Sequence, residues 1–377
     1  MTVIDGLGLS TLIMIKNIQS KIDIGALFSP RVVSQIAFLI IVLFIGIKFY
    51  NFVTLLEKGI IPDFARPAGV DAFLPIGALV SLKHLLFTGT INTVHPSGLV
   101  LFLIICMTAV LVKKGFCSWI CPVGFLSDLL AKLHVKIFKK KLELPGYLDL
   151  PLRSIKSLLA GFFIWSIFYK MPIISIEQFI QSPYNRFADV KMLKFFTDIS
   201  NTALIIIIVL SFLSFIIPYF WCRYLCPYGA VLGAISFFSF GKIKRDPANC
   251  TDCGKCEKNC PGLIKIRKKT TIHSSECSAC MTCIKNCPEK GALKFSFFPG
   301  NRAVGQPVIA IIFVCLFFMG ITLAKVSDHW HNNITTSEYL EYIRPRSMPS
   351  MPWGVKGKIA PEKMERMRQK MMALQKQ

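Results

Sequence analysis

The stretch NCTDCGKCEKNCP at residues 249–261 returns as ECSACMTCIKNCP at residues 276–288. Each copy has the spacing C-x-x-C-x-x-C-x-x-x-C-P. The two-residue gaps let one curled loop direct three thiolates at three corners of a cubane, and the Cys-Pro step redirects the chain so that the fourth thiolate serves a second cubane. The repeated stretch therefore predicts two 4Fe-4S clusters whose ligand sets cross over.

The crossing gives two predicted ligand sets. Zinc is the alternative, because paired C-x-x-C motifs also build ribbons and fingers, but zinc sites rarely use a third cysteine at this spacing. Two complete copies with a 16-residue connection resemble the bacterial two-cluster ferredoxins over this whole segment. The sets are Cys250, Cys253, Cys256 and Cys287 for cluster 1, and Cys277, Cys280, Cys283 and Cys260 for cluster 2.

The remaining chain has the composition of a membrane protein. Of its residues 53% are hydrophobic and only 17% are charged, and the mean hydropathy is +0.54. The net charge of +23 could suggest nucleic acid. In a chain this apolar, Lys and Arg gather instead in cytoplasmic loops that face anionic lipid. We therefore expect the lipid membrane, and not nucleic acid, as a partner.

Five segments have the length and low charge of transmembrane helices, and a sixth is a shorter apolar stretch that a re-entrant or interfacial helix would explain. The expected fold is thus an all-α multi-pass membrane protein of about five to six transmembrane helices, with an inserted α+β ferredoxin domain of the bacterial two-cluster type. The five segments are residues 33–56, 97–112, 157–176, 202–218 and 303–324, and the sixth is 73–87.

Basic residues set the expected orientation. The connection at residues 113–156 holds nine Lys or Arg against three acidic residues, so it should be cytoplasmic. Counting helices from there places the cysteine-rich segment in the cytoplasm. The expected divisions are an N-terminal cytoplasmic segment (1–31), a membrane domain (32–240), a ferredoxin domain (241–302), a last transmembrane helix (303–324) and a basic C-terminal tail (325–377).

A second cysteine repeat lies at the cytoplasmic ends of two expected spans. FCSWICPVG carries Cys117 and Cys121, and WCRYLCPYG carries Cys222 and Cys226. The matching C-x-x-x-C-P pattern is an internal parallel repeat that could bring four thiols together. A third redox or metal centre, a disulfide, and simple packing all remain open. Trp119, inside the first copy, is expected to be a membrane-interface anchor.

With these residues in view, the chain resembles the NapH-like membrane ferredoxins, which also include the NosR C-terminal region and CcoG, and within them the YccM-type electron-transport proteins. The likeness covers residues 66–297 and rests on ARPAGVDAFLPIGAL, KKGFCSWICPVG, SPYNRFADVKMLKFF, FWCRYLCPYGA and the two cluster motifs. It implies a multi-pass inner-membrane protein that moves electrons between the quinone pool or a cytoplasmic donor and a redox partner, either quinol-linked or a periplasmic reductase.

Two function classes follow. The first is an electron carrier, or a subunit of an oxidoreductase complex, with no catalytic residue of its own; the chain has no Gly-rich dinucleotide fingerprint. The second is an assembly or regulatory protein that supplies reducing equivalents for maturing a metalloenzyme or oxidase. His84 and His95, near the expected outer face, are candidate quinone contacts.

Overall fold

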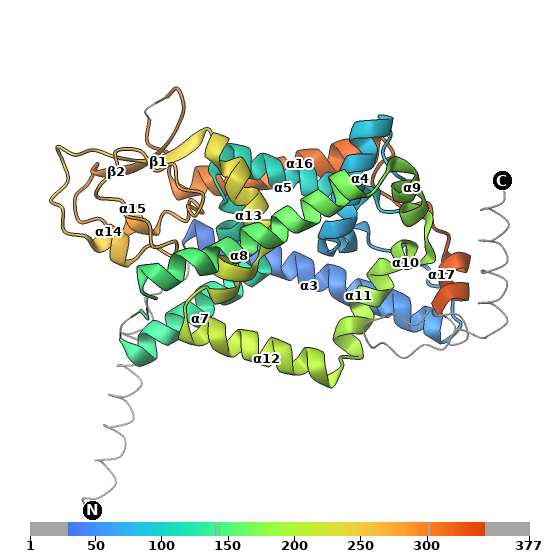
Figure 1. Ribbon diagram of the computed structural model, residues 1–377. Helices are drawn as coiled ribbons and strands as arrows, with labels where there is room; N and C mark the ends of the chain where they lie inside the picture. Colours follow the sequence, from blue (N-terminus) through green and yellow to red (C-terminus); the bar gives the residue numbers. More distant parts are fainter. Residues whose placement is uncertain (1–28, 140, 143, 301, 344–377) are drawn as a thin grey trace, which may run out of the picture.

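The computed structural model describes residues 29–139, 141–142, 144–300 and 302–343. Most of the expected N-terminal segment and of the basic tail therefore lies outside the described residues. The described part is almost entirely helical, with one small sheet (Figure 1). In chain order the elements are α3 (Pro30–Glu57), η1 (Ala68–Phe73), α4 (Pro75–Thr88), α5 (Pro96–Val112), α6 (Gly115–Trp119), α7 (Pro122–Phe138), α8 (Gly146–Trp165), η2 (Ser166–Lys170), α9 (Ile173–Gln181), α10 (Pro183–Arg186), α11 (Ala188–Thr197), α12 (Asn201–Ile216), η3 (Trp221–Leu225), α13 (Pro227–Ile235), η4 (Ser236–Phe238), β1 (Gly241–Arg245), α14 (Lys255–Lys258), α15 (Thr282–Lys285), β2 (Leu293–Phe297), α16 (Gln306–Val326) and α17 (Thr336–Ile343).

The long helices α3, α5, α8 and α16 all extend along the length of the molecule, and α3 and α8 cross each other in the view (Figure 1). The sheet and the two cysteine loops lie at one end of this bundle, and α9, α10 and α17 lie at the other end. Large apolar side chains stay exposed along the sides of the bundle, for example Ile40 (61%), Ile205 (61%) and Phe318 (70%). Such an apolar outer surface is what a lipid environment would cover.

Three helices among the described residues are long and apolar enough to cross a membrane: α3, α8 continued by η2, and α16. A fourth span is present if α11 and α12, which are bent by 77° at their junction, count as one. The expected span at 157–176 is displaced, because the helix begins at Gly146 and ends before Pro172, whose fixed φ and missing N–H end it. Helix length alone therefore supports three or four of the expected five to six spans.

The central helix α5, with 17 residues, is shorter than α3, α8 and α16 but is the most enclosed helix in the bundle. Leu99, Ala109 and Val112 on it are fully buried, and α16 packs closely along it. A Cβ at Gly320 of α16 would overlap the Ile104 side chain, so glycine permits this approach. The expected re-entrant stretch forms α4, a helix of 14 residues that packs beside α5.

The cysteine-rich segment is closed by the two-stranded sheet. Strand β1 pairs with β2 in antiparallel register from Gly241 opposite Phe297 to Arg245 opposite Leu293. The pairing brings both ends of the segment together, so the segment leaves the bundle after α13 and returns directly into α16. Phe295 on β2 is fully buried and anchors the sheet in a core shared with Phe313 of α16.

Candidate metal centres

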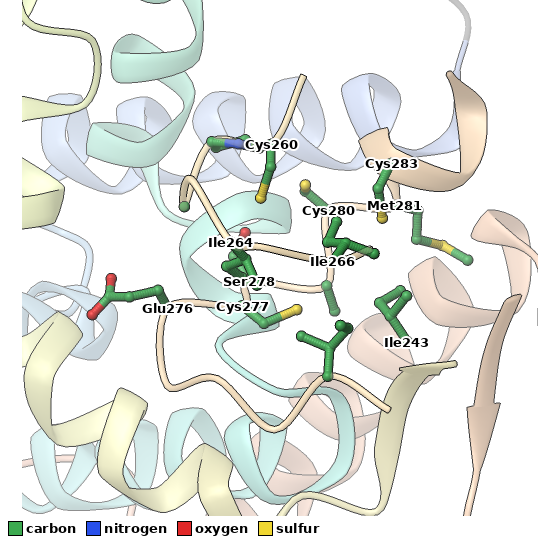
Figure 2. Close-up of a pocket in the computed structure, with 14 residues that line it drawn as sticks. Ile243, Cys260, Ile264, Ile266, Glu276, Cys277, Ser278, Cys280, Met281 and Cys283 are labelled. Atoms are coloured by element: carbon green, nitrogen blue, oxygen red, sulfur yellow. The ribbon is translucent and has the colours of Figure 1, made fainter. Parts of the chain in front are cut away.

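The first cysteine pocket collects residues from both cysteine runs. Cys277, Cys280 and Cys283 come from the second run and Cys260 from the first, and all four are buried. Their thiols surround one hollow, whereas the Glu276 carboxylate is directed away from it (Figure 2). The cavity measures about 390 Å³, part of it open to solvent, and its other walls are aliphatic, with Ile243, Ile264, Ile266 and Ile272 among them. This is the set predicted for cluster 2, and we call it the proximal pocket because it lies against the helical bundle.

The second cysteine pocket mirrors the first. Cys250, Cys253 and Cys256 of the first run share it with Cys287 of the second, the set predicted for cluster 1. Cys253 is exposed, and Arg267 lines the pocket beside it and donates from Nη1 to the Asp252 carbonyl (3.3 Å). We call this the distal pocket. The crossover of the fourth cysteine is therefore a property of the folded chain.

The two loops share an unusual backbone. Asp252 (φ 56°) and Gly254 (φ 73°) flank the second cysteine of the first run, and Ala279 (φ 47°) and Met281 (φ 57°) occupy the equivalent places in the second. Left-handed residues next to right-handed ones turn successive N–H groups to the same side, which forms an anion-binding concavity. Each loop thus presents its backbone donors where an anionic iron-sulfur cluster would sit.

Among the described residues, no three His, Cys, Asp or Glu side chains converge as they would around a single metal ion. A cubane is held at four separate iron corners, so its thiolates need not converge on one point. Burial raises the pKa of the Cys277 thiol to about 11, although neighbouring backbone donors oppose the shift. Cluster binding would therefore have to displace a proton from this residue.

A row of hydrogen bonds fastens the proximal pocket to the helical bundle. The Lys114 N–H donates to the Cys277 carbonyl (3.3 Å), Ser118 Oγ to the Ser278 carbonyl (2.6 Å) and Trp119 Nε1 to the Ala279 carbonyl (3.1 Å). Three consecutive carbonyls of the cysteine loop thus accept from the segment that contains Cys117. Trp119 is fully buried by this contact, so the expectation of a membrane-interface anchor was wrong.

A buried ion triad reinforces the same junction. Glu276 Oε2 lies 3.2 Å from Lys114 Nζ, and Glu276 Oε1 lies 2.7 Å from Lys156 Nζ on α8. Burial by itself would raise the pKa of Glu276, but the two ammonium groups lower it to about 2. The carboxylate is therefore ionised at neutral pH, and it holds two otherwise buried cations.

In both copies of the C-x-x-x-C-P repeat, the second cysteine directly precedes a helix. Cys121 precedes α7 and Cys226 precedes α13, each with extended backbone and with proline as the first helical residue. Cys226 Sγ accepts from the Gly229 N–H (3.3 Å), which is the bond of a helix N-cap. Thiolates at helix N-termini are stabilised by the helix dipole. The repeat therefore aims two helix N-termini at its second cysteines.

The four thiols of the repeat are neighbours. Cys117 lies within electrostatic range of Cys121, Cys222 and Cys226. Cys222 also lies 3.4 Å from Ser127 Oγ, so α7 of the first copy contacts the second copy directly. Cys106 and Cys315, the two cysteines outside both repeats, lie inside α5 and α16. The parallel repeat predicted from the sequence thus brings its four cysteines into one group.

Comparison with known proteins links both cysteine regions to iron-sulfur families. A family model described as a 4Fe-4S dicluster domain matches residues 242–288, and one described as a 4Fe-4S binding domain matches residues 94–145 and 202–245. YccM of Escherichia coli strain K12, whose name places it provisionally in electron transport, is 39% identical over 325 residues, which are 85% of this chain and 90% of YccM. The chain belongs to the YccM family.

More distant relatives of this YccM-family chain are named as ferredoxin-type proteins. NapH of Haemophilus influenzae is 28% identical over 44% of this chain and 53% of NapH. The methylamine utilization protein MauN of Methylobacillus flagellatus is 23% identical over 54% of this chain and 67% of MauN. No solved structure gives a significant match. The predicted resemblance to YccM-type and NapH-like proteins is confirmed.

The two histidines considered for quinone lie at the end of the bundle away from the cysteines. His84, on α4, is partly exposed and its Nδ1 lies 3.0 Å from the Thr90 carbonyl. His95 is buried, with Nδ1 3.0 Å from an Asp71 carboxylate oxygen and Nε2 2.7 Å from the Asn185 carbonyl. Both ring nitrogens of His95 are therefore engaged within the protein.

His95 belongs to a buried network that sequence reasoning missed. Arg66 pairs with both Asp71 and Asp189, and Tyr339 of α17 donates to Asp189 (2.9 Å). Arg66 and Asp189 are separated by more than a hundred residues, so their spacing gave no sign that they form an ion pair. The one available signal was that charged residues stand in apolar stretches, where a buried charge needs a partner. The network locks η1, α5, α11 and α17 together at the far end of the bundle.

Proposed function

We propose that this chain is a membrane-bound iron-sulfur electron-transfer protein. The observation that carries the proposal is the pair of cysteine pockets, each completed by a cysteine from the other run, with the proximal pocket hydrogen-bonded to the C-x-x-x-C-P segment. The residues fit two 4Fe-4S clusters, because each pocket offers four thiols and inward backbone donors. Such clusters supply one-electron transfer without proton or hydride chemistry.

The chain's own residues position and insulate these centres. Four isoleucines line the proximal pocket with apolar surface, and the contacts of Lys114, Ser118 and Trp119 hold its loop against the bundle. A fixed loop and largely apolar walls keep the surroundings of the centre unchanged between its redox states. Electrons would pass between the distal and proximal pockets and then toward the C-x-x-x-C-P group.

We also propose the C-x-x-x-C-P thiols as a third centre, of iron-sulfur type. The part of the chain matched as a 4Fe-4S binding domain contains Cys106, Cys117, Cys121, Cys222 and Cys226 but none of the eight ferredoxin cysteines. Four of these five form the group described above. The closeness of Trp119 to both cysteine systems favours a redox centre over simple packing or a disulfide.

A glycine pair tests the third centre. A Cβ at Gly124 would overlap the Cys117 carbonyl oxygen, whereas the nearest atom to a Cβ at the equivalent Gly229 is 3.7 Å away. We expect Gly124→Ala to separate α7 from α6 and to remove about four irons, while Gly229→Ala keeps full iron content. Iron analysis with EPR would check this. Equal iron in both variants and the wild type would count against a centre between the repeats.

We propose an inner-membrane location with five to six spans and with the cysteine pockets in the cytoplasm. The three long apolar helices and the basic connection at 113–156 support this orientation. The spans beyond those three would be α5, shielded by its neighbours, the bent pair α11 and α12, and, for a sixth, α4.

We further propose that the quinone pool or a cytoplasmic donor exchanges electrons with this chain and that a partner protein takes them up or supplies them. His84 is the better-placed of the two histidines for quinone, because His95 is enclosed. The test is to reduce the protein in lipid nanodiscs and add a menaquinone analogue. Return of the absorbance of the oxidised clusters would support electron transfer to quinone, and a spectrum that stays reduced would reject it.

A further inference from the structure

The two cysteine pockets differ in their access to solvent. All four cysteines of the proximal pocket are buried, whereas Cys253 of the distal pocket is exposed and Cys250 and Cys287 are half-buried. The distal pocket also contacts α14, which lies at the outer tip of the molecule, beyond the ends of the long helices (Figure 1). A protein outside the membrane could therefore approach the distal pocket closely but not the proximal one.

The surface around the distal pocket carries more basic than acidic side chains, because Asp252 and Glu289 of its lining are outnumbered by two arginines and the adjacent lysines. Lys255 lies between two residues that line it, Gly254 and Cys256, while Lys268 follows the lining residue Arg267 and Lys290 follows Glu289. The side chains of Lys255, Arg267, Lys268 and Lys290 are exposed. Within the described ranges, the one salt bridge that any of these four makes joins Arg267 to Glu257. The three lysines are thus not used to neutralise charges of their own domain.

The lysines around the distal pocket are better placed to bind a protein than to bind lipid headgroups. The long helices would cross the membrane lengthwise, and α14, which carries the lining residue Cys256, lies at one end of the bundle (Figure 1). A bilayer around the helices would face the sides of the bundle and not its tip. The three lysines near the pocket therefore meet the aqueous phase.

We propose that this distal face is the docking site of an acidic one-electron carrier protein, and that electrons enter the chain there. The inference rests on the proposed function. In the transfer step a reduced carrier loses one electron and the distal centre gains it, and no proton or bond is exchanged. Charge complementarity would steer the encounter and would be weakened by salt.

The test uses the full-length protein in nanodiscs of neutral phosphatidylcholine, mixed with reduced flavodoxin, an acidic carrier. We expect the triple variant Lys255→Glu, Lys268→Glu and Lys290→Glu to slow cluster reduction about 10- to 100-fold at low salt and to lose its salt dependence. The matched control is Lys132→Glu, Lys136→Glu and Lys139→Glu, which reverses three exposed charges at α7. Reduced riboflavin, a small reductant without an acidic protein surface, should reduce all three proteins at the same rate.

Two results would overturn the docking site: an unchanged flavodoxin rate in the distal variant, or equal slowing in the α7 control. An unchanged flavodoxin rate together with lost binding to anionic phosphatidylserine vesicles would assign the lysines to lipid. Absence of cluster absorbance in the wild type would refute the proposed electron-transfer function itself and the docking site with it. If riboflavin also reduced the distal variant slowly, the substitutions would have damaged the cluster. The milder double variant Lys268→Gln with Lys290→Gln would then replace it. The proposal stands only if this double variant is reduced more slowly by flavodoxin and at the wild-type rate by riboflavin.

Discussion

Replacing Cys260 with serine is expected to remove about four irons from the proximal pocket, although Cys260 belongs to the other cysteine run. Cys260 lines the same cavity as Cys277, Cys280 and Cys283, and β1, β2 and the connecting loop hold it there. Losing one of four thiolates opens a corner of the cubane to water. By the same reasoning, Cys287→Ser should damage the distal centre that Cys253 lines.

EPR of the reduced proteins would distinguish the two variants. Cys260→Ser should lose the EPR signal of the buried proximal centre. Cys287→Ser should lose the signal of the distal centre, which is the one that paramagnetic relaxation agents in the solvent should broaden. Cys315→Ser is the control, because Cys315 is an exposed residue within α16. If Cys260→Ser and Cys253→Ser removed the same signal, the crossed ligand sets would be wrong.

The second large effect is expected at Glu276. The change Glu276→Gln leaves Lys114 and Lys156 buried without their shared carboxylate, at a cost of about 3–5 kcal/mol. The junction between the proximal pocket and the bundle should open, so cluster absorbance should be lost at lower temperature. The midpoint of that thermal loss is the measurement.

Two further variants make the Glu276 prediction specific. Glu57→Gln breaks the ion pair of Glu57 with Lys194, in which the Glu57 side chain is 36% exposed. This change should therefore lower the free energy of unfolding by only about 0–1 kcal/mol. Adding Lys156→Met to Glu276→Gln removes one of the two buried ammonium groups left without a partner. The double variant should therefore regain part of the lost midpoint temperature. An unchanged midpoint in Glu276→Gln would show that the triad does not stabilise the junction.

The sequence allowed the cysteine pockets to be predicted because ligand spacing within a loop is a local property. Cys250, Cys253 and Cys256 lie within seven residues, and the Cys-Pro step that sends Cys260 elsewhere is equally local. The helices α3 and α16 were predictable for a similar reason, since each is a long apolar run. The crossing of the fourth ligand needed the additional knowledge that two such runs fold together.

What could not be predicted depends on contacts between distant segments. Trp119 was predicted to be an interface anchor because nothing in the sequence pointed to its hydrogen-bond acceptor. That acceptor is the backbone carbonyl of Ala279, and every residue has such a carbonyl. Glu276 stood out neither by pattern nor by spacing, and its importance arises from lysines 120 and 162 residues away. The beginning of α8 was placed too late, because Asp149 and Arg153, a salt-bridged pair within the helix, lower its apolar character. In each case tertiary packing, and not the local pattern, determines the structure.

The proposed function requires two crossed clusters next to a third centre at the C-x-x-x-C-P thiols. The most direct test is the iron and labile-sulfide content of the anaerobically purified full-length protein, measured beside a variant with Cys117, Cys121, Cys222 and Cys226 all changed to serine. We predict about twelve irons per chain in the wild type and about eight in the variant. Zinc in place of iron, or equal iron contents in the two proteins, would contradict this proposal.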